Sequence, residues 1–296
     1  MKYYILTVFS AATFFVQAQP TFELSNNVYR IPYATGTFVT VSRDHFTHTS
    51  PTADVTGRYD LVGYGQGSGC SVYRLVAAAP GIIRRIVDNH NTRPPGCDPD
   101  CADFNNYVWI EHANGEWTKY THMKQNSATQ DAGLILNDTV CAGAFLGYEC
   151  DIGQASGRHL HFEVRRPNNP ANVDISVAGG FMGRNDALHY VPVINSIAKH
   201  FMQDGDALVA SGSNSCTNTN ITVPAITLPN NTFRVYMASS DIITNNNAVQ
   251  FQNGSNGLFH AGTSITFSPG FSANAGSSFH ARIGNCAPTP FPGGCN

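Results

Sequence analysis

Short apolar runs separated by Gly, Pro and Asn turns follow one another from about residue 27 to residue 166, and none keeps a convincing 3.6-residue period. Runs of this length that are rich in Val, Ile, Tyr and Thr are typical of β-strands. We therefore expect an all-β fold built on an antiparallel β-sheet with long loops, notably at 89–106 and 124–140. The clearest predicted strands are Ser71–Ala78, Gly81–Val87, Tyr107–His112, Thr118–Met123 and His159–Arg165.

Helical spacing occurs at one place, where Val193, Ile197 and Phe201 recur along one face. This spacing predicts a packing helix over Val193–Met202.

The composition changes near 211–216. The ninety residues from Ala207 to the end carry only three charged side chains, while Asn, Ser, Thr and Gly dominate. The triplet Phe259-His260-Ala261 recurs as Phe279-His280-Ala281, twenty residues later. A fixed period indicates stacked β-turn repeats, either a small solenoid or a sandwich. We expect a first domain over 27–210 and a C-terminal β-repeat region over 216–296, with His260 and His280 at equivalent surface positions.

Charge excludes some classes of partner. Charged residues make up 12% of the 296 positions, the formal net charge is −3, and the chain has only four lysines. No basic footprint exists for nucleic acid or for an anionic membrane. The length is ample for a buried core, and 42% hydrophobic residues argue against wholesale disorder.

The N-terminus has the features of a secretory signal peptide over residues 1–18. Lys2 precedes the apolar run Tyr3–Val16, and a Val16-Gln17-Ala18 cleavage site follows. A transmembrane anchor is less favoured, because the apolar run is shorter than the roughly 20 residues that span a bilayer. We therefore expect a secreted protein, extracellular or periplasmic, without membrane insertion after cleavage.

An even number of cysteines in an exported chain favours disulfides over a thiolate metal site. The pairing stays open: Cys97 and Cys101 flank a Pro/Asp turn, and Cys141 and Cys150 could close a hairpin. The eight are Cys70, Cys97, Cys101, Cys141, Cys150, Cys216, Cys286 and Cys295.

The most informative segment for chemistry is Gly157–Val164, which contains an H-x-H pair. Alternation along a strand places His159 and His161 on one face, while Leu160 and Phe162 point to the other, towards the core. Two imidazoles then converge on one site. A further histidine, His122, ends the strand that begins at Thr118.

Upstream of this pair, Asp44-His45-Phe46-Thr47-His48 precedes Arg58-Tyr59-Asp60-Leu61-Val62-Gly63, and an Ala-Ala-Pro-Gly-Ile turn follows at 78–82. In this order the pieces resemble the lysostaphin/LytM-type zinc metallopeptidases over roughly 45–165. Members of that family are bacterial endopeptidases that cut peptide cross-links of peptidoglycan and, in some cases, glycine-rich proteins. The resemblance implies that His48, Asp60 and His161 bind zinc and that His122 and His159 are catalytic.

The first motif departs from the family pattern. Most members space the first His and Asp as H-x3-D, whereas His48 precedes Asp60 by twelve residues. Some relatives carry a longer insertion there, so His48 is paired with Asp60. The combinations of His45 with Asp60, and of His48 with Asp54, stay open.

The chemistry is coherent for a Zn²⁺ cofactor. Zinc held by two neutral imidazoles and one carboxylate keeps a fourth position for water, whose pKa falls to about 7. The chain contains no H-E-x-x-H motif, so His122 and His159 are the candidates to take the water proton and stabilise the oxyanion. His112, at the end of a strand, is expected to cap a turn or to lie beside the site.

The expected function is that of a secreted zinc endopeptidase acting on peptidoglycan cross-links or glycine-rich peptides. Residues 216–296 would attach it to a surface or matrix, so their deletion is expected to preserve cleavage of a small peptide. Two alternatives stay open: an inactive module that binds the cell wall or regulates a partner, and an adhesive surface protein.

Overall fold

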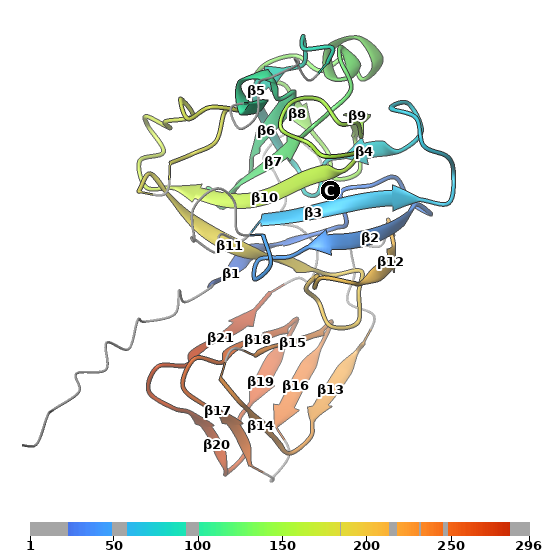
Figure 1. Ribbon diagram of the computed structural model, residues 1–296. Coiled ribbons are helices and arrows are strands. Elements are labelled where there is room, and N and C mark those ends of the chain that lie inside the picture. The colour runs from blue at the N-terminus through green and yellow to red at the C-terminus, as the bar shows by residue number, and fades with distance from the viewer. Residues whose placement is uncertain are drawn as a thin grey trace, which may run out of the picture.

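A computed structural model describes residues 23–48, 58–92, 101–183, 185–212, 218–230, 232–244 and 248–284. The predicted signal peptide and Asp54 lie outside these residues. The regular secondary structure of the described part is nearly all strand, with an antiparallel-sheet domain above and a narrower C-terminal region below in Figure 1. Among the described residues, no helix has the length and apolarity needed to cross a membrane.

The main sheet has the order β12-β2-β3-β10-β7-β6-β5-β8, and its pairings are antiparallel. β11 extends it by pairing with β10 and, in parallel, with β1. A separate ribbon joins β4 to β9. The bounds are β1 Glu23–Tyr29, β2 Phe38–Arg43, β3 Arg58–Tyr64, β4 Arg74–Val76, β5 Gly81–Val87, η1 Cys101–Phe104, β6 Tyr107–Glu111, β7 Trp117–Thr121, η2 Ser127–Asp131, β8 Thr139–Val140, β9 Phe145–Tyr148, β10 Leu160–Pro167, β11 Ala187–Ile194 and β12 Ala207–Val209.

The predicted all-β class is confirmed, and the predicted strand Gly81–Val87 coincides with β5. The predicted helix over Val193–Met202 is wrong. Val193 and Ile194 are the last residues of strand β11, where they pair with Val28 and Tyr29 of β1 and are fully buried. The apparent helical spacing arose because apolar residues of a strand and of the following turn fall at similar intervals.

Alternation along the central strands separates the core from a polar face. Leu61 of β3, Phe162 of β10 and Tyr120 of β7 are buried in the main hydrophobic core. Their neighbours Asp60 and His161 lie in register, opposite each other, on the other face. The paired strands β3, β10 and β7 therefore fix the positions of the polar side chains on this face of the sheet.

One disulfide joins two described cysteines, Cys70 and Cys150, with Cα atoms 4.6 Å apart. Cys101 and Cys141 are also disulfide-bonded. The suggested hairpin closure by Cys141 and Cys150 is therefore wrong, since Cys150 pairs with Cys70. This bond ties the loop after β3 to the segment just before the H-x-H pair.

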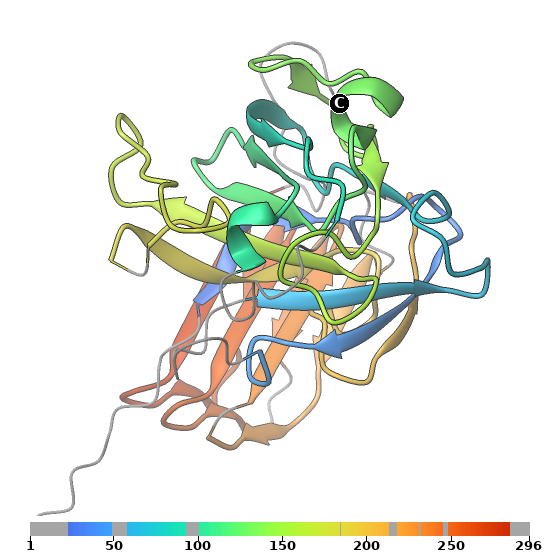
Figure 2. The same ribbon diagram turned by 45° about the horizontal axis from the view of Figure 1, so that its top comes forward.

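The C-terminal strands form a solenoid of stacked coils, the first of the two predicted arrangements. Three rows of parallel strands run along it: β13-β16-β19, β14-β17-β20 and β15-β18-β21 (Figure 2). Its strands are β13 Asn220–Val223, β14 Ile226–Leu228, β15 Phe233–Ala238, β16 Asp241–Thr244, β17 Val249–Phe251, β18 Asn256–Ala261, β19 Ser264–Thr266, β20 Phe271–Ala273 and β21 Ser278–Ile283.

The repeated Phe-His-Ala triplet is not the structural repeat. Asn256 pairs with Ser278, so this coil takes 22 residues, and Phe259 lies beside Ala281. His260 is buried, whereas His280 is exposed. The predicted equivalence of these two histidines is therefore wrong, because a spacing of twenty residues is two short of a coil.

Candidate metal centre

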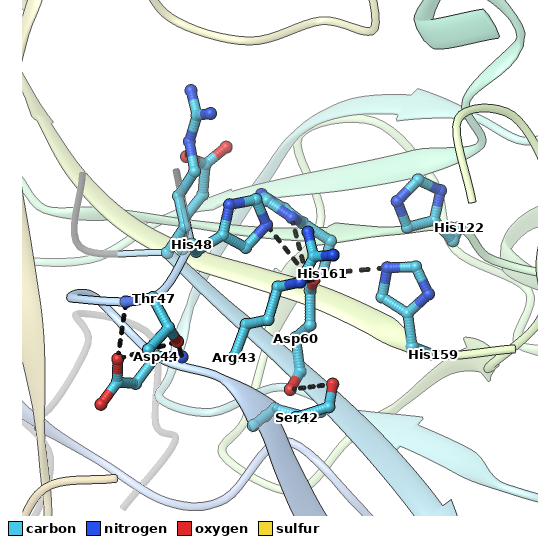
Figure 3. Close-up of polar contacts among 12 residues, drawn as sticks. Ser42, Arg43, Asp44, Thr47, His48, Asp60, His122, His159 and His161 are labelled. Atoms are coloured by element: carbon cyan, nitrogen blue, oxygen red, sulfur yellow. Dashed lines mark hydrogen bonds and ion pairs between the residues drawn. The ribbon is translucent and has the colours of Figure 1, made fainter. Parts of the chain in front are cut away.

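Two imidazoles and one carboxylate converge on the polar face of the sheet. Asp60 comes from β3 and His161 from β10, while His48 follows the turn after β2 (Figure 3). Asp60 Oδ1 lies 3.1 Å from His48 Nε2 and 3.2 Å from His161 Nδ1. All three side chains are less than a tenth exposed. The structure thus brings together the three residues that the sequence singled out as ligands.

The three donor atoms fit a zinc ion. Zinc bonded to imidazole nitrogen and carboxylate oxygen at about 2.0–2.2 Å in a tetrahedron needs ligand atoms about 3.3 Å apart. The two measured separations from Asp60 Oδ1 are close to this edge length, and the three ligand atoms lie within 4.8 Å of one another. Two nitrogens and one carboxylate oxygen also form a donor set that zinc commonly takes in catalytic sites.

The carboxylate stays ionised in this buried position. Burial alone would raise the pKa of Asp60, but the hydrogen bonds from His161 and His48 outweigh it and hold the pKa well below its usual range. Burial lowers the pKa of His161 to about 4, so its ring is neutral near pH 7. A neutral imidazole and a carboxylate are the protonation states in which these groups bind a metal.

His122 and His159 lie beside this cluster with their rings 4.6 Å apart. His122 Nδ1 donates to the Ile152 carbonyl and His159 Nδ1 donates to the Gly157 carbonyl, both at 2.8 Å. Because a carbonyl only accepts, each Nδ1 carries a proton, and in the neutral form of each ring the lone pair is at Nε2. His159 Nε2 lies 3.6 Å from Asp60 Oδ1.

His122 is held in an unusual backbone conformation. Its φ is 66°, in the left-handed region that non-glycine residues rarely adopt. Burial and the neighbouring His159 and His161 lower its pKa well below 6.5, so the ring is neutral. A strained backbone at a neutral imidazole beside the His48, Asp60 and His161 cluster is typical of a functional position.

His45, the alternative first ligand, lies elsewhere. Its ring is fully buried, and its Nδ1 is 2.8 Å from the Tyr59 hydroxyl, on the core side of β3. Burial lowers the pKa of His45 to about 4. It is not among the residues gathered around Asp60. The other alternative, Asp54, falls outside the described residues.

The polar face continues beyond His161 into a buried charged row that sequence reasoning missed. Glu163 lies opposite Lys119 of β7 and Arg58 of β3, and Arg165 Nε donates to its carboxylate at 2.7 Å. Lys119 Nζ donates to the Gly179 carbonyl. Alternation from His161 would have placed Glu163 and Arg165 on this face.

Phe181 covers this charged row next to the cluster. Its ring centroid is 3.1 Å from Lys119 Nζ and 5.5 Å from the ring of His161, which it meets edge to face. Trp109 Nε1 donates to the Gly180 carbonyl, which fixes the loop against the sheet. Phe181 therefore covers the sheet face on one side of the His48, Asp60 and His161 cluster.

His112 lies in the core rather than at the site. Its Nδ1 donates to the Pro80 carbonyl at 2.8 Å and its Nε2 is 2.9 Å from Thr118 Oγ1. Burial lowers the pKa of His112 to about 4. Its backbone also closes the turn to Glu116, because its N donates to the Glu116 carbonyl at 2.8 Å and its carbonyl accepts from Gly115 N at 2.9 Å, as the turn-capping expectation has it.

This burial predicts an acid-sensitive contribution to stability. The folded pKa of His112 is depressed, so its contribution is complete above pH 6.5 and is lost as the pH falls towards 4. A shift of 2 to 2.5 pKa units corresponds to about 3 kcal/mol. Between pH 7.5 and pH 4, the free energy of unfolding in urea should decrease in both proteins. The decrease should be about 3 kcal/mol smaller for His112→Asn than for wild type. Equal falls would contradict a buried neutral His112.

A cavity of about 320 Å³ lies where the loop around Lys199 meets β14 and β15. None of its lining residues belongs to the His/Asp cluster.

Residues 72–173 match the model described as "Peptidase family M23". The match includes His122, His159 and His161 and begins after His48 and Asp60.

Among curated proteins, the chain is similar to the "DD-carboxypeptidase/endopeptidase Mpg" of Neisseria meningitidis serogroup B, with 36% identity over 75 residues. The matched segment is 25% of this chain and 16% of the Neisseria protein. A protein of the same description from Neisseria gonorrhoeae matches equally well.

Two solved structures are among those to which the chain is similar. The M23 metalloprotease pseudoalterin, described as from the deep sea, is 19% identical, with a TM-score of 0.34 over 63% of this chain and 96% of that one. The catalytic domain of lysostaphin from Staphylococcus simulans is 13% identical, with a TM-score of 0.28 over 55% of this chain and 89% of that one.

Proposed function

We propose, from the match of residues 72–173 to peptidase family M23, that the chain is a secreted zinc-dependent endopeptidase. The observation that carries the proposal is the convergence of His48 Nε2 and His161 Nδ1 on Asp60 Oδ1, with two further histidines alongside. The family supports a metallopeptidase, and the donor set supports zinc.

His48, Asp60 and His161 would hold the ion, which supplies an acidified water and polarises the scissile carbonyl. Two imidazole ligands and one carboxylate would leave a net positive site when zinc is bound. The buried surroundings strengthen each electrostatic interaction with a developing negative charge.

The proton of the attacking water would be taken up by His122 or His159. Each presents an Nε2 lone pair, and each is fixed by a carbonyl that binds its Nδ1–H. A fixed tautomer means that neither ring needs to reorient before it accepts a proton or a hydrogen bond. One ring would take the water proton at its Nε2. The other would hold the oxyanion only as an imidazolium, whose Nε2–H donates to the negative oxygen.

The substrate class follows from the space beside the cluster. The Phe181 ring packs against the His161 ring, so a substrate residue on that side of the scissile bond would have little room. Glycine and alanine fit this restriction, and both occur in the cross-links and bridges of peptidoglycan. The similar Neisseria proteins, described as DD-carboxypeptidase/endopeptidase, support the same class.

The test is hydrolysis of two substrates by the full chain: a glycine-rich peptide and cross-linked peptidoglycan fragments. We expect cleavage that a chelator abolishes and added Zn²⁺ restores. Zinc binding without cleavage of either substrate would contradict the proposal and support the inactive-module alternative.

An N-terminal sequence of the exported protein that begins at Gln19 is expected for the proposed secretion, and retention of residues 1–18 would contradict it.

Phe181→Ala is expected to relax the size restriction. For peptides with Val or Leu beside the scissile bond, kcat/KM should rise by about tenfold, whereas Gly and Ala peptides should change little. Phe267→Ala, which removes a half-exposed ring in the solenoid, is the matched control. An unchanged size profile in the Phe181 variant would show that this ring does not border the substrate.

A further inference from the structure

The turn that carries His48 is organised by one carboxylate. Asp44 Oδ1 accepts hydrogen bonds from the backbone amides of Phe46 and Thr47, at 2.9 and 3.0 Å. His48 N donates to the Asp44 carbonyl at 2.8 Å, and Asp204 N donates to Asp44 Oδ2 at 3.1 Å. The position of the His48 ring therefore depends on the position of this turn.

His48 has less support from the sheet than the other two residues of the cluster. Asp60 and His161 lie on paired central strands, and ladder hydrogen bonds fix both of them. His48 lies beyond the end of β2, which ends at Arg43, and is twelve residues from Asp60 in sequence. A ligand outside the sheet needs a contact from another part of the chain to hold it in place.

The solenoid supplies such a contact. Phe233, the first residue of β15, lies with its ring 4.9 Å from that of His45 and 5.6 Å from that of Phe46. Phe201 completes the cluster, 5.7 Å from Phe233. His45 is fixed from the other side by the Tyr59 hydroxyl, and Tyr59 precedes Asp60. The turn is thus held between the strand that carries Asp60 and a side chain of the solenoid.

The side chain of Phe233 packs in the hydrophobic core of the sheet domain. It is 6% exposed and packs within the main core, together with Val235, Met237 and Leu258. The solenoid has a separate core, which includes Phe251 and Phe259. The contact between the two regions is therefore a shared core rather than a loose tether.

We propose that Phe233 is a positioning residue for His48, so that the C-terminal coils are a structural part of the metal centre. The ring backs the Asp44–His48 turn and holds the imidazole within reach of Asp60. This role goes beyond the surface attachment expected from the sequence. It rests on the proposed metal site and not on the proposed substrate.

The experiment compares two phenylalanine truncations in the full chain. Phe233→Ala removes the ring that touches the turn. Phe271→Ala removes a ring of the same size that packs on the solenoid core, where its aromatic neighbours are Phe251, Phe259, Phe267 and Phe279. Each variant is titrated with Zn²⁺ against a chelator and with Co²⁺, whose visible absorption reports its coordination geometry. Thermal melting of the metal-free proteins records any general loss of stability.

We expect Phe233→Ala to weaken the metal Kd by about tenfold or more and to alter the Co²⁺ spectrum. Phe271→Ala should keep the wild-type Kd and spectrum even where its Tm falls. Wild-type binding by a folded Phe233→Ala protein, or equal weakening in both variants, would overturn the positioning role. If Phe233→Ala does not fold, Phe233→Leu decides: a loss of two- to fivefold supports the role, and a wild-type Kd overturns it.

Failure of the proposed metal site gives a different result. In that case the wild-type protein itself would take up neither Zn²⁺ nor Co²⁺. Binding by wild type together with unchanged binding by Phe233→Ala rejects only the positioning role.

Discussion

Asp60→Asn is expected to lower kcat/KM for peptide hydrolysis by about three orders of magnitude, because a metal and its polarised water supply several kcal/mol of transition-state stabilisation. The carboxylate is the group on which both candidate imidazole ligands converge. An amide has nearly the same shape but no charge, so the substitution removes the anionic ligand without creating a cavity. The measurement is kcat/KM together with bound zinc per chain.

The matched control is Asp131→Asn, which alters an exposed carboxylate paired with Lys124. It should leave both hydrolysis and metal content unchanged. Retained hydrolysis in Asp60→Asn, at more than about a tenth of the wild-type rate, would remove this residue from the proposed mechanism.

Truncation after residue 212 is the second large expected effect. It removes the solenoid and uncovers the partners of Phe233 in the sheet domain, chiefly Phe46 and Phe201. Exposure of two such side chains costs about 3–6 kcal/mol, a large part of the 5–15 kcal/mol that stabilises a typical domain. We expect a Tm lower by roughly 10 °C or more, and weaker metal binding.

The sequence alone led to the opposite expectation, that deletion of the tail would spare cleavage of a small peptide. The proposed positioning role of Phe233 predicts the opposite, because its ring packs against His45 and Phe46 of the turn that bears His48. Measurement of Tm and metal Kd on the truncated chain separates the two views. A truncated protein with wild-type Tm and Kd would show that the coils are only an appended module.

The parts of the site that lie on regular strands were accessible from the sequence. Alternation alone put His159 and His161 on one face, and the structure places both beside Asp60. The same alternation extends to Glu163, whose burial among cations went unrecognised because charged residues are normally assigned to the surface.

The features that depend on long-range packing could not be predicted. Phe181 reaches the cluster from a loop twenty residues beyond His161, and nothing in its local sequence indicates a contact with Lys119. The link between Phe233 and the His48 turn joins segments almost 190 residues apart. Helical spacing at Val193 was misleading because pairing with β1 outweighs local periodicity.

The most direct test of the central claim is metal stoichiometry by native mass spectrometry on the wild-type chain and on Asp60→Asn, His48→Ala, His161→Ala and His45→Ala. The proposed site predicts one zinc per chain in wild type and none in the first three variants. His45→Ala should still bind zinc, but with lower affinity, because His45 supports the turn without facing Asp60. Absence of zinc from the reconstituted wild-type protein, or full retention in His161→Ala, would contradict the account.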